Sequence, residues 1–505
     1  MSDPGARLPW GEAMFRAYER SPETGADGAP DPAALATFLR REAAREGMTE
    51  ADYQKRLAVT GAARTIRQLL ASGALRLNEA AALLGLPWSR VYREAIAQGI
   101  VTQDPDWAVE ARGEISRTIE RIRGSTHLRV QTVEYKSSYD STAPLLMEVA
   151  FDPSQRKMPI FVLMHGGYPG SRLPMVRLLE HYAAKGLFCV VPSLRGRDGS
   201  AGRPDSYGVE VHDIFDAVEH AKADFPFYVD PTNVNIFGGS AGGADVIYAV
   251  QRFPDYFRIG ISFYGLDDLG EYVTQPWWVG EWEDPESVSA AKALVQRFVD
   301  DVGGSPEMAP DRYLMRDMTL GFINNPYTEV WAMWDEEEHQ SPGADRVGAS
   351  FAAQATSLGY ANIHLRRSTR GDLFRWHHWR VPDHRWADRF FLARMLAGAV
   401  PAPLLADTGR LNVCGYLRTH RFTIALGDGT NALAQVDYEL SPNFLQFWFR
   451  RMSRDPDAEG WVEIPEISQG VWRVMRDGAP VPLDGVVGTR FAVGLDSRIE
   501  CRKEA

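Results

Sequence analysis

The chain has few cysteines and no long apolar run, which argues against a disulfide-rich protein and against a membrane-spanning one. Its 505 residues include three cysteines, Cys189, Cys414 and Cys501, which are far apart and lack the spacing of metal ligands. Such a sparse, odd set indicates a reducing compartment without a disulfide framework. No run of about eighteen apolar residues occurs, so no membrane-spanning segment is predicted. Residues 1–15 lack the apolar core of a signal peptide, and we therefore expect a cytoplasmic protein.

Positive charge is also scarce. The chain carries 55 Lys and Arg against 67 Asp and Glu, a net charge of −12. This balance argues against a general nucleic-acid binder. The apolar fraction of 45% and the charged fraction of 24% are ordinary for a soluble globular protein. A chain of this length can form two or three domains with sizeable cores.

A glycine-rich stretch with one serine at its centre is the most informative segment. The apolar run at 234–237 is typical of a buried strand, and it leads into Gly238, Ser240 and Gly242 in the pattern G-x-S-x-G. A helical segment follows at 244–251. This arrangement predicts a nucleophile elbow, in which a tight turn exposes the serine hydroxyl. The flanking glycines are needed because a Cβ would collide with the neighbouring strand or helix. A glycine-rich loop with an idle serine is the alternative.

The hydrophobic pattern divides the chain into three parts. Residues 1–126 show helical periodicity interrupted by glycines, which predicts an N-terminal helical, cap-like domain. Residues 127–400 alternate apolar runs with helical segments, which predicts an α/β domain with a doubly wound, mostly parallel sheet. Residues 401–505 show short alternating strands between Gly- and Asp-containing turns, which predicts a small antiparallel β domain, a sandwich.

The α/β part contains a predicted insertion at residues 270–322. It carries Trp277, Trp278 and Trp282. Insertions at the carboxyl edge of an open α/β sheet lie over the active site, so these side chains either line the pocket or fix the insertion in place. The expected strands are 128–135, 145–151, 159–164, 188–192, 259–264, 330–334 and 362–367, and the expected helices are 175–185, 209–224, 288–302, 344–358 and 384–397.

Residues 77–92 resemble a helix-turn-helix. Ala81, Gly85 and Val91 occupy the small, turn and buried aliphatic positions of that motif, and a DNA-binding role would place Arg90 in a groove. The other interpretation is a helical hairpin that packs on the catalytic domain and shapes its pocket. The acidic balance favours the hairpin, so nucleic acid is not an expected partner.

Several motifs together carry a family resemblance. They are His165-Gly166-Gly167, Arg195-Gly196-Arg197-Asp198-Gly199, Asp213, Asp230-Pro231, and the elbow at 238–243. With these motifs, residues 128–397 resemble the prolyl oligopeptidase and dienelactone hydrolase branch of the α/β-hydrolases. The resemblance implies an α/β-hydrolase fold and a Ser-His-acid triad, with Ser240 as nucleophile. It implies neither a metal nor an organic cofactor.

The resemblance also suggests the base. In that branch the histidine opens a stretch of the form His-Gly-Phe-Arg-x-Pro-Glu, and residues 377–383 fit it with His377 in the catalytic place. A shift of one residue, to His378, fits less well. His384 falls at the start of the predicted closing helix and is expected to be structural.

Four acidic residues compete for the third place in the triad. Asp335, Glu336, Glu337 and Glu338 follow the strand predicted at 330–334. The family spacing places the acid four residues before a proline, and Pro342 points to Glu338. Asp335 is the more usual residue type, but the strand has barely ended there. We predict Glu338, with Asp335 as the first alternative and Glu337 left open.

These residues predict a reaction. The backbone N–H groups of Ala241 and of Gly167 or Tyr168 would stabilise the oxyanion, with the Tyr168 hydroxyl as a further donor. We expect hydrolysis of an ester or amide bond in a small molecule through an acyl-enzyme on Ser240. A peptidase acting on short peptides is the alternative, although the β-propeller usual in that branch is missing before the catalytic domain. A helix-turn-helix regulator with a hydrolase-fold sensor domain is the alternative of another class. Formation of a homo-oligomer is left open.

Overall fold

The computed structural model describes the following parts of the chain: residues 8–9, 49, 101–102, 107–166, 172–274, 285–335, 343–368, 391–401, 403–455, 458–469, 471–481 and 489–504. Most of the predicted N-terminal domain lies outside these residues, including the helix-turn-helix-like segment 77–92. The tryptophans of the insertion lie outside them as well. Two short strands, β1 (Leu8–Pro9) and β2 (Val101–Thr102), pair with each other in parallel.

An eight-stranded sheet forms the centre of the molecule. Its strands lie in the order β10-β9-β8-β7-β5-β6-β4-β3, and β4 runs antiparallel to both of its neighbours while the other pairs are parallel. Their bounds are β3 (Arg129–Tyr135), β4 (Leu145–Phe151), β5 (Met158–Met164), β6 (Phe188–Ser193), β7 (Val229–Gly239), β8 (Ile259–Phe263), β9 (Glu329–Asp335) and β10 (Ile363–Ser368). This is the sheet of an α/β-hydrolase, and the predicted fold class is confirmed.

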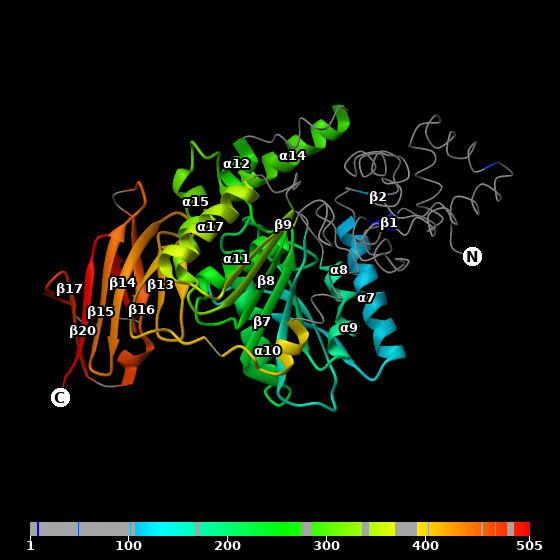
Figure 1. Ribbon diagram of the computed structural model, residues 1–505, viewed down its shortest axis with the longest axis horizontal. Helices are drawn as coiled ribbons and strands as arrows, with labels where there is room; N and C mark the ends of the chain where they lie inside the picture. Colours follow the sequence, from blue (N-terminus) through cyan, green and yellow to red (C-terminus); the bar gives the residue numbers. More distant parts are fainter. Residues whose placement is uncertain are drawn as a thin grey trace.

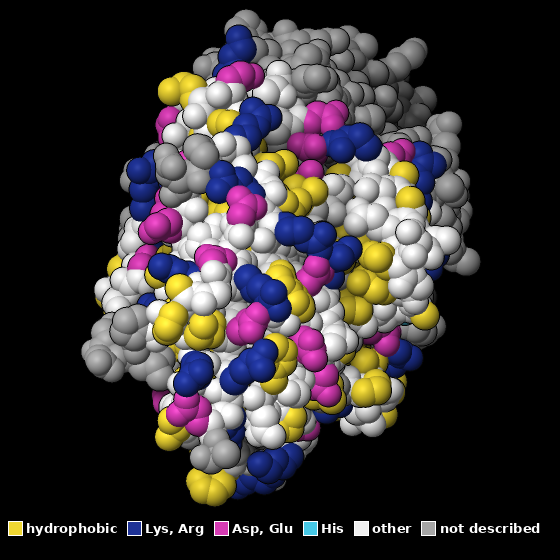
Figure 2. Space-filling view, turned by 90° about the vertical axis from the view of Figure 1, so that its left-hand side faces the viewer, with side chains coloured by type: hydrophobic (Ala, Val, Ile, Leu, Met, Phe, Trp, Pro, Cys, Tyr) yellow, Lys and Arg dark blue, Asp and Glu magenta, His cyan; other side chains and the backbone are white. Residues whose placement is uncertain are grey.

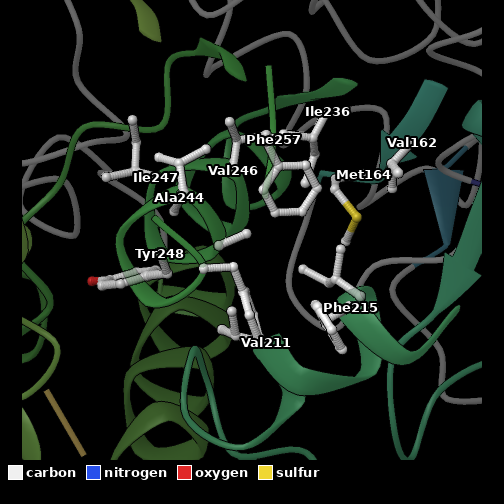
Figure 3. Close-up of a cluster of buried hydrophobic side chains, with 14 of the residues drawn as sticks. Val162, Met164, Val211, Phe215, Ile236, Ala244, Val246, Ile247, Tyr248 and Phe257 are labelled. Atoms are coloured by element: carbon white, nitrogen blue, oxygen red, sulfur yellow. The ribbon is translucent and has the colours of Figure 1, made fainter. Parts of the chain in front are cut away.

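Helices cover both faces of the sheet because each central strand is buried on both sides. Along β5, Ile160, Val162 and Met164 join one apolar cluster, and Phe161 and Leu163 join the other. Figure 3 shows part of the first cluster, where side chains of β5 and β7 meet those of the helices. The first face is covered by α10 (Glu210–Asp224), α11 (Ala241–Arg252) and α17 (Ala344–Leu358), and the second by α7 (Trp107–Ser125), α8 (Leu173–Val176), α9 (Leu179–Ala183) and α19 (Ala393–Leu396).

Some element predictions need correction. The single helix predicted at 175–185 is two short helices, α8 and α9. Between them the Leu178 N–H donates to the carbonyl of Met175, three residues earlier, instead of to the residue four positions earlier. The helix after the elbow starts at Ala241 rather than at Ala244. The predicted helix 344–358 matches α17. Gly343 and Gly359, both in left-handed conformations, flank this helix. Of the predicted closing helix 384–397, the described part contains α19.

The described parts of the segment between β8 and β9 are largely helical, and the sequence predicted one helix there, at 288–302. It contains α12 (Leu269–Thr274), α14 (Pro285–Val302), α15 (Pro310–Leu314), α16 (Met318–Gly321) and the 3₁₀ helix η1 (Phe322–Asn324). In Figure 1, α12 and α14 lie above the sheet. Arg203 Nη2 donates to the Asp300 carbonyl at 2.6 Å, and this bond ties α14 to the loop after β6.

The C-terminal part is an antiparallel β sandwich, as predicted. One sheet has the order β11-β14-β15-β20-β17-β18 and the other β12-β13-β16-β19. The bounds are β11 (Thr408–Cys414), β12 (Tyr416–Arg418), β13 (Thr423–Leu426), β14 (Leu433–Ser441), β15 (Phe444–Arg451), β16 (Glu459–Glu463), the 3₁₀ helix η3 (Pro465–Gln469), β17 (Trp472–Arg476), β18 (Ala479–Pro480), β19 (Arg490–Gly494) and β20 (Arg498–Lys503). Figure 2 views the molecule from the side of this domain, where basic and acidic side chains are interspersed.

The sandwich contacts the α/β domain through buried polar bonds. Asn324 Nδ2 donates to the Asn412 carbonyl at 2.7 Å, and the Asn412 N–H donates to Asn324 Oδ1 at 2.8 Å. On the same junction the His212 ring lies edge-on to Tyr416, with ring centroids 3.7 Å apart. These contacts attach the sandwich to the insertion and to α10.

Candidate active site

Ser240 has the backbone geometry of an elbow. It lies between the end of β7 and the start of α11 with φ 56° and ψ −128°, a conformation that a non-glycine residue adopts only when its surroundings enforce it. The enforcing bonds are present. The Ser240 N–H donates to the Phe263 carbonyl at 2.7 Å, and the Ser240 carbonyl accepts from the Ala244 N–H at 3.0 Å. The turn is therefore locked both to β8 and to the first turn of α11.

The two flanking glycines are required by space. A Cβ on Gly238 would lie 2.2 Å from the Gly242 carbonyl oxygen, and a Cβ on Gly242 would lie 2.5 Å from the Met164 carbonyl oxygen. Both distances are shorter than any contact a real Cβ atom makes, and both involve backbone atoms that cannot rotate away. The structure thus supplies the physical reason for the G-x-S-x-G pattern.

The first predicted oxyanion donor is placed by the helix. Ala241 is the first residue of α11, so its N–H is among those that have no acceptor within the helix. The positive end of the helix dipole adds to the field at this point. Gly167 and Tyr168, the other predicted donors, lie outside the described residues.

The loop that contains Gly167 and Tyr168 is described at both of its ends. At its start, a Cβ built on Gly166 would lie 3.3 Å from the Cβ of Ser240. At its end, the Arg172 N–H donates to Asp198 Oδ2 at 2.7 Å, and the Arg172 guanidinium pairs with Glu148 through Nε and Nη2. Gly166, on one side of residues 167–171, therefore lies beside the nucleophile, and Arg172, on the other side, lies in a buried ion pair.

Arg172 and Glu148 belong to a buried charge network that sequence reasoning missed. Arg172 is 3% exposed and Glu148 is fully buried. The opposite charges of Glu148 and Asp198 raise the pKa of Arg172 against the effect of burial, which is the largest single influence. The sequence offers one signal, the apolar strand around Glu148, and no comparable signal for Arg172.

A second buried pair holds the loop after β6. Arg195 donates to Asp213 on α10 through Nε at 2.9 Å and Nη2 at 2.6 Å, and its Nη1 lies 2.6 Å from Asp140 Oδ2. Burial raises the pKa of Asp213 to about 7 although Arg195 opposes the shift. Both residues belong to the motifs that carry the family resemblance, and their role in the structure is to position this loop.

His165 closes β5 beside the site. Its side chain is 1% exposed, and burial, with a further contribution from Arg197, lowers its pKa to about 3. His165 is therefore neutral at any physiological pH. It cannot supply positive charge beside Ser240.

The strands that precede the predicted acid and base end at the same edge of the sheet. The registers Gly239 to Phe263 and Phe263 to Met333 align the ends of β7, β8 and β9, and Ser368 pairs with Asp335 at the ends of β10 and β9. Carboxyl ends of parallel strands meet at one edge, which is where ligands bind in such sheets.

The acid and base side chains themselves are not described. Glu337 and Glu338 follow β9, and His377 and His378 follow β10, outside the described residues. Asp335 is described as the last residue of β9, while nothing is described of its side chain. The triad thus stays a prediction for these residues.

The comparisons with known proteins agree with this fold. Residues 176–296 match the model of the prolyl oligopeptidase family. This part of the α/β domain is thus similar to the prolyl oligopeptidase family. The matched segment contains the elbow, α10 and the loop after β8. No curated protein sequence matches the chain.

Several solved structures are similar to part of this hydrolase. An esterase of Pyrococcus furiosus is 12% identical, with 54% of this chain and 91% of that chain covered and a TM-score of 0.40. An acylaminoacyl peptidase of Pyrococcus horikoshii is 17% identical, with 55% of this chain and 43% of that chain covered and a TM-score of 0.40. An esterase of Pyrobaculum calidifontis is 15% identical, with 62% of this chain and 99% of that chain covered and a TM-score of 0.41.

Two further properties concern the described residues alone. Within the described ranges no three His, Cys, Asp or Glu side chains come together in a way that could hold a metal ion. The helices that the structure describes are all too short or too polar to cross a membrane. The chain is a serine hydrolase by its family match and its elbow.

Proposed function

We propose that this serine hydrolase cleaves an ester or amide bond of a small molecule through an acyl-enzyme on Ser240. The observation that carries the proposal is the backbone of Ser240, which is held at positive φ by bonds to β8 and α11. Strain of this kind persists where the surroundings enforce it, and it clusters at functional sites.

The chemistry needs a base, an orienting acid and oxyanion donors. His377 takes the proton from Ser240 Oγ as that oxygen attacks the substrate carbonyl, and Glu338 holds the imidazole in the required tautomer. The N–H groups of Ala241 and of Gly167 or Tyr168 stabilise the oxyanion. The protonated His377 then gives its proton to the leaving alcohol or amine, and water releases the acyl group by the same steps. His378 and Asp335 are the alternatives for the base and the acid.

Fluorophosphonate labelling tests the nucleophile. We expect the probe to modify Ser240, and Ser240→Ala to lose both labelling and turnover while its circular dichroism is unchanged. Labelling at another residue, or full turnover by the alanine variant, would refute the assignment.

Peptide hydrolysis is a second candidate, favoured by the match of residues 176–296 to the prolyl oligopeptidase family. A panel of p-nitrophenyl esters and aminoacyl p-nitroanilides separates the two. Preference for the esters supports the small-molecule hydrolase, and preference for the anilides supports the peptidase. A regulator that binds DNA would instead shift duplex DNA in a manner that weakens with salt.

A further inference from the structure

A tyrosine with a strained backbone lies next to the residue that holds the nucleophile in place. Tyr264 directly follows β8 and has φ 54°, in the left-handed region. A bulky aromatic residue is a genuine outlier in this region, and it stays there only when its surroundings enforce the conformation. Ser240, with φ 56°, occupies the same region directly after β7. Two strained residues therefore follow neighbouring strands at one edge of the sheet.

One peptide unit connects the two strained residues. The carbonyl of Phe263 accepts from the Ser240 N–H at 2.7 Å, and the N–H of Tyr264 donates to the Met333 carbonyl at 2.7 Å. The C=O and N–H of a planar trans peptide point in opposite directions, so this unit reaches the elbow on one side and β9 on the other. The three strands β7, β8 and β9 lie side by side (Figure 1). The ladder of the sheet thus continues one residue beyond the ends of β7 and β8, although the chain has already turned there.

The turn at Tyr264 brings the next residue against the helix of the nucleophile. A Cβ built on Gly265 would lie 2.1 Å from the Gly243 carbonyl carbon and 2.4 Å from the Ala244 nitrogen. A Cβ built on Gly243 would lie 2.6 Å from the carbonyl oxygen of Phe263, which is the acceptor of the Ser240 N–H. With an extended conformation at Tyr264 the chain would continue along β8 and lose this contact. The loop then runs through residues 266–268 to α12.

The side chain of Tyr264 anchors the strained backbone. Its ring is 3% exposed and belongs to the second apolar cluster, together with Phe237, Phe263, Met333 and Phe391. The rings of Tyr264 and Phe263 lie 6.4 Å apart at an angle of 47°. Burial of an aromatic ring stabilises the fold and offsets the strain of the backbone. The surroundings that enforce the positive φ are therefore present on both sides of the residue.

We propose that Tyr264 is a positioning residue for the reaction at Ser240. Its left-handed backbone orients the peptide between residues 263 and 264, and that peptide holds the elbow in register with β9. Met333 lies two residues before Asp335, the end of β9, where the predicted acid turn 335–338 begins. The peptide thus fixes the nucleophile relative to the strand that leads to the acid. The inference rests on the proposed function, because it concerns the rate at which Ser240 reacts.

A backbone ester tests this peptide in the full chain. Replacement of Tyr264 by 3-(4-hydroxyphenyl)lactic acid keeps the ring, removes the N–H and makes the Phe263 carbonyl a weaker acceptor. One exchange therefore weakens both hydrogen bonds of the peptide. We expect kcat for p-nitrophenyl butyrate and the rate of fluorophosphonate labelling of Ser240 to fall about tenfold, the equivalent of about one hydrogen bond. KM should change less than about twofold, because the peptide does not bind the substrate.

Tyr228 offers a matched control. Its N–H donates to the Phe225 carbonyl at 2.9 Å directly before β7 begins, at the opposite end of that strand from Ser240. The same ester at Tyr228 also weakens the backbone hydrogen bonding, so it should lower the stability in a similar way. It should leave kcat and labelling within about twofold of wild type. Equal rates in the two ester variants would overturn the proposal, whatever their stabilities.

A pair of side-chain variants tests the positive φ. Tyr264→Gly and Tyr264→Ala both remove the ring, but glycine reaches the left-handed region without strain and alanine does not. We expect Ser240 to be labelled about fivefold faster in Tyr264→Gly than in Tyr264→Ala. An extended residue would give the opposite order, since glycine weakens a strand relative to alanine. Equal rates, or faster labelling of Tyr264→Ala, would show that the left-handed conformation does not matter for Ser240.

Hydrogen exchange separates this inference from the proposed function. Exchange of the Ser240 amide, measured by mass spectrometry on peptides that span residues 238–243, needs no turnover. Faster exchange in the Tyr264 ester than in the Tyr228 ester supports the role of the peptide, even if the proposed function fails because Ser240 is never labelled. If wild-type Ser240 is labelled while the Tyr264 ester changes neither exchange nor labelling, the hydrolase stands and the positioning role is refuted.

Discussion

Asp267 should destabilise the folded protein, and the effect should depend on pH. Its pKa is raised from 3.8 in the unfolded chain to about 7 in the folded protein. Above pH 7 the carboxyl is charged in both states, and the folded state carries the full cost of burying that charge. Below pH 4 it is neutral in both states and the cost disappears. The sign is therefore the reverse of that of a salt-bridged aspartate, since stability falls as the pH rises.

The magnitude follows from the shift. About three pKa units at ~1.4 kcal/mol per unit give a cost of about 4 kcal/mol at pH 8. The same relation gives about 2 kcal/mol at pH 5 and less than about 1 kcal/mol at pH 4. Partial exposure of the residue reduces the value at pH 8 towards about 2 kcal/mol.

Asp267→Asn is the perturbation that removes this cost. The variant should be more stable than wild type at pH 8, with a melting temperature about 5–10 °C higher for a domain of this size. The difference should shrink steadily towards pH 4. Thermal unfolding of both proteins from pH 4 to 8 measures it, with Glu271→Gln as the control whose difference stays small. An unchanged or lower melting temperature for Asp267→Asn at pH 8 would show that the carboxylate is compensated in the folded protein, and the reasoning would fail.

Two other predictions concern the site. Arg172→Met leaves the carboxylate of Glu148 buried without its partner and should lower the free energy of unfolding by about 3–5 kcal/mol. We expect a lower melting temperature and slower labelling of Ser240 by fluorophosphonate. Addition of Glu148→Gln should restore part of the stability. Glu338→Gln should lower kcat/KM on the order of 10⁴-fold and His377→Ala on the order of 10⁶-fold, whereas Glu336→Gln should have little effect. The kcat/KM of the wild-type protein should rise with pH through about 6 to 7. If Asp335→Asn is inactive and Glu338→Gln is active, the acid is Asp335. If His378→Ala is inactive and His377→Ala is active, the base is His378.

Much of the fold could be predicted because the local pattern and the tertiary structure agree. The apolar runs at β5 and β7 are buried on both faces, and α17 is bounded by glycines that end a helix. In the C-terminal domain the pattern predicts strands at 422–426, 434–438, 445–450, 470–476 and 490–495. The strands β11, β12, β16, β18 and β20 are not among these predictions. Their residues alternate over only a few positions, and pairing with other strands of the two sheets stabilises them instead.

The site was predictable where backbone geometry imposes the residue type. Gly238 and Gly242 could be assigned because no other residue fits at these positions. Asp267, Arg172 and Glu148 could not be assigned, since a charged residue is expected at the surface and its burial is decided by segments far away in the chain. A position just after a buried strand was the available signal for Asp267.

The charges at the carboxyl edge of the sheet differ in what they can contribute. Arg172 with Glu148, and Arg195 with Asp213, are satisfied pairs that fix two loops beside Ser240. Such pairs add little net stability, because desolvation offsets their attraction, but breaking one is costly and so each loop has one favoured position. Asp267 differs from them, because its Oδ1 is buried without a hydrogen-bond partner and it forms no ion pair within the part of the chain that the structure describes.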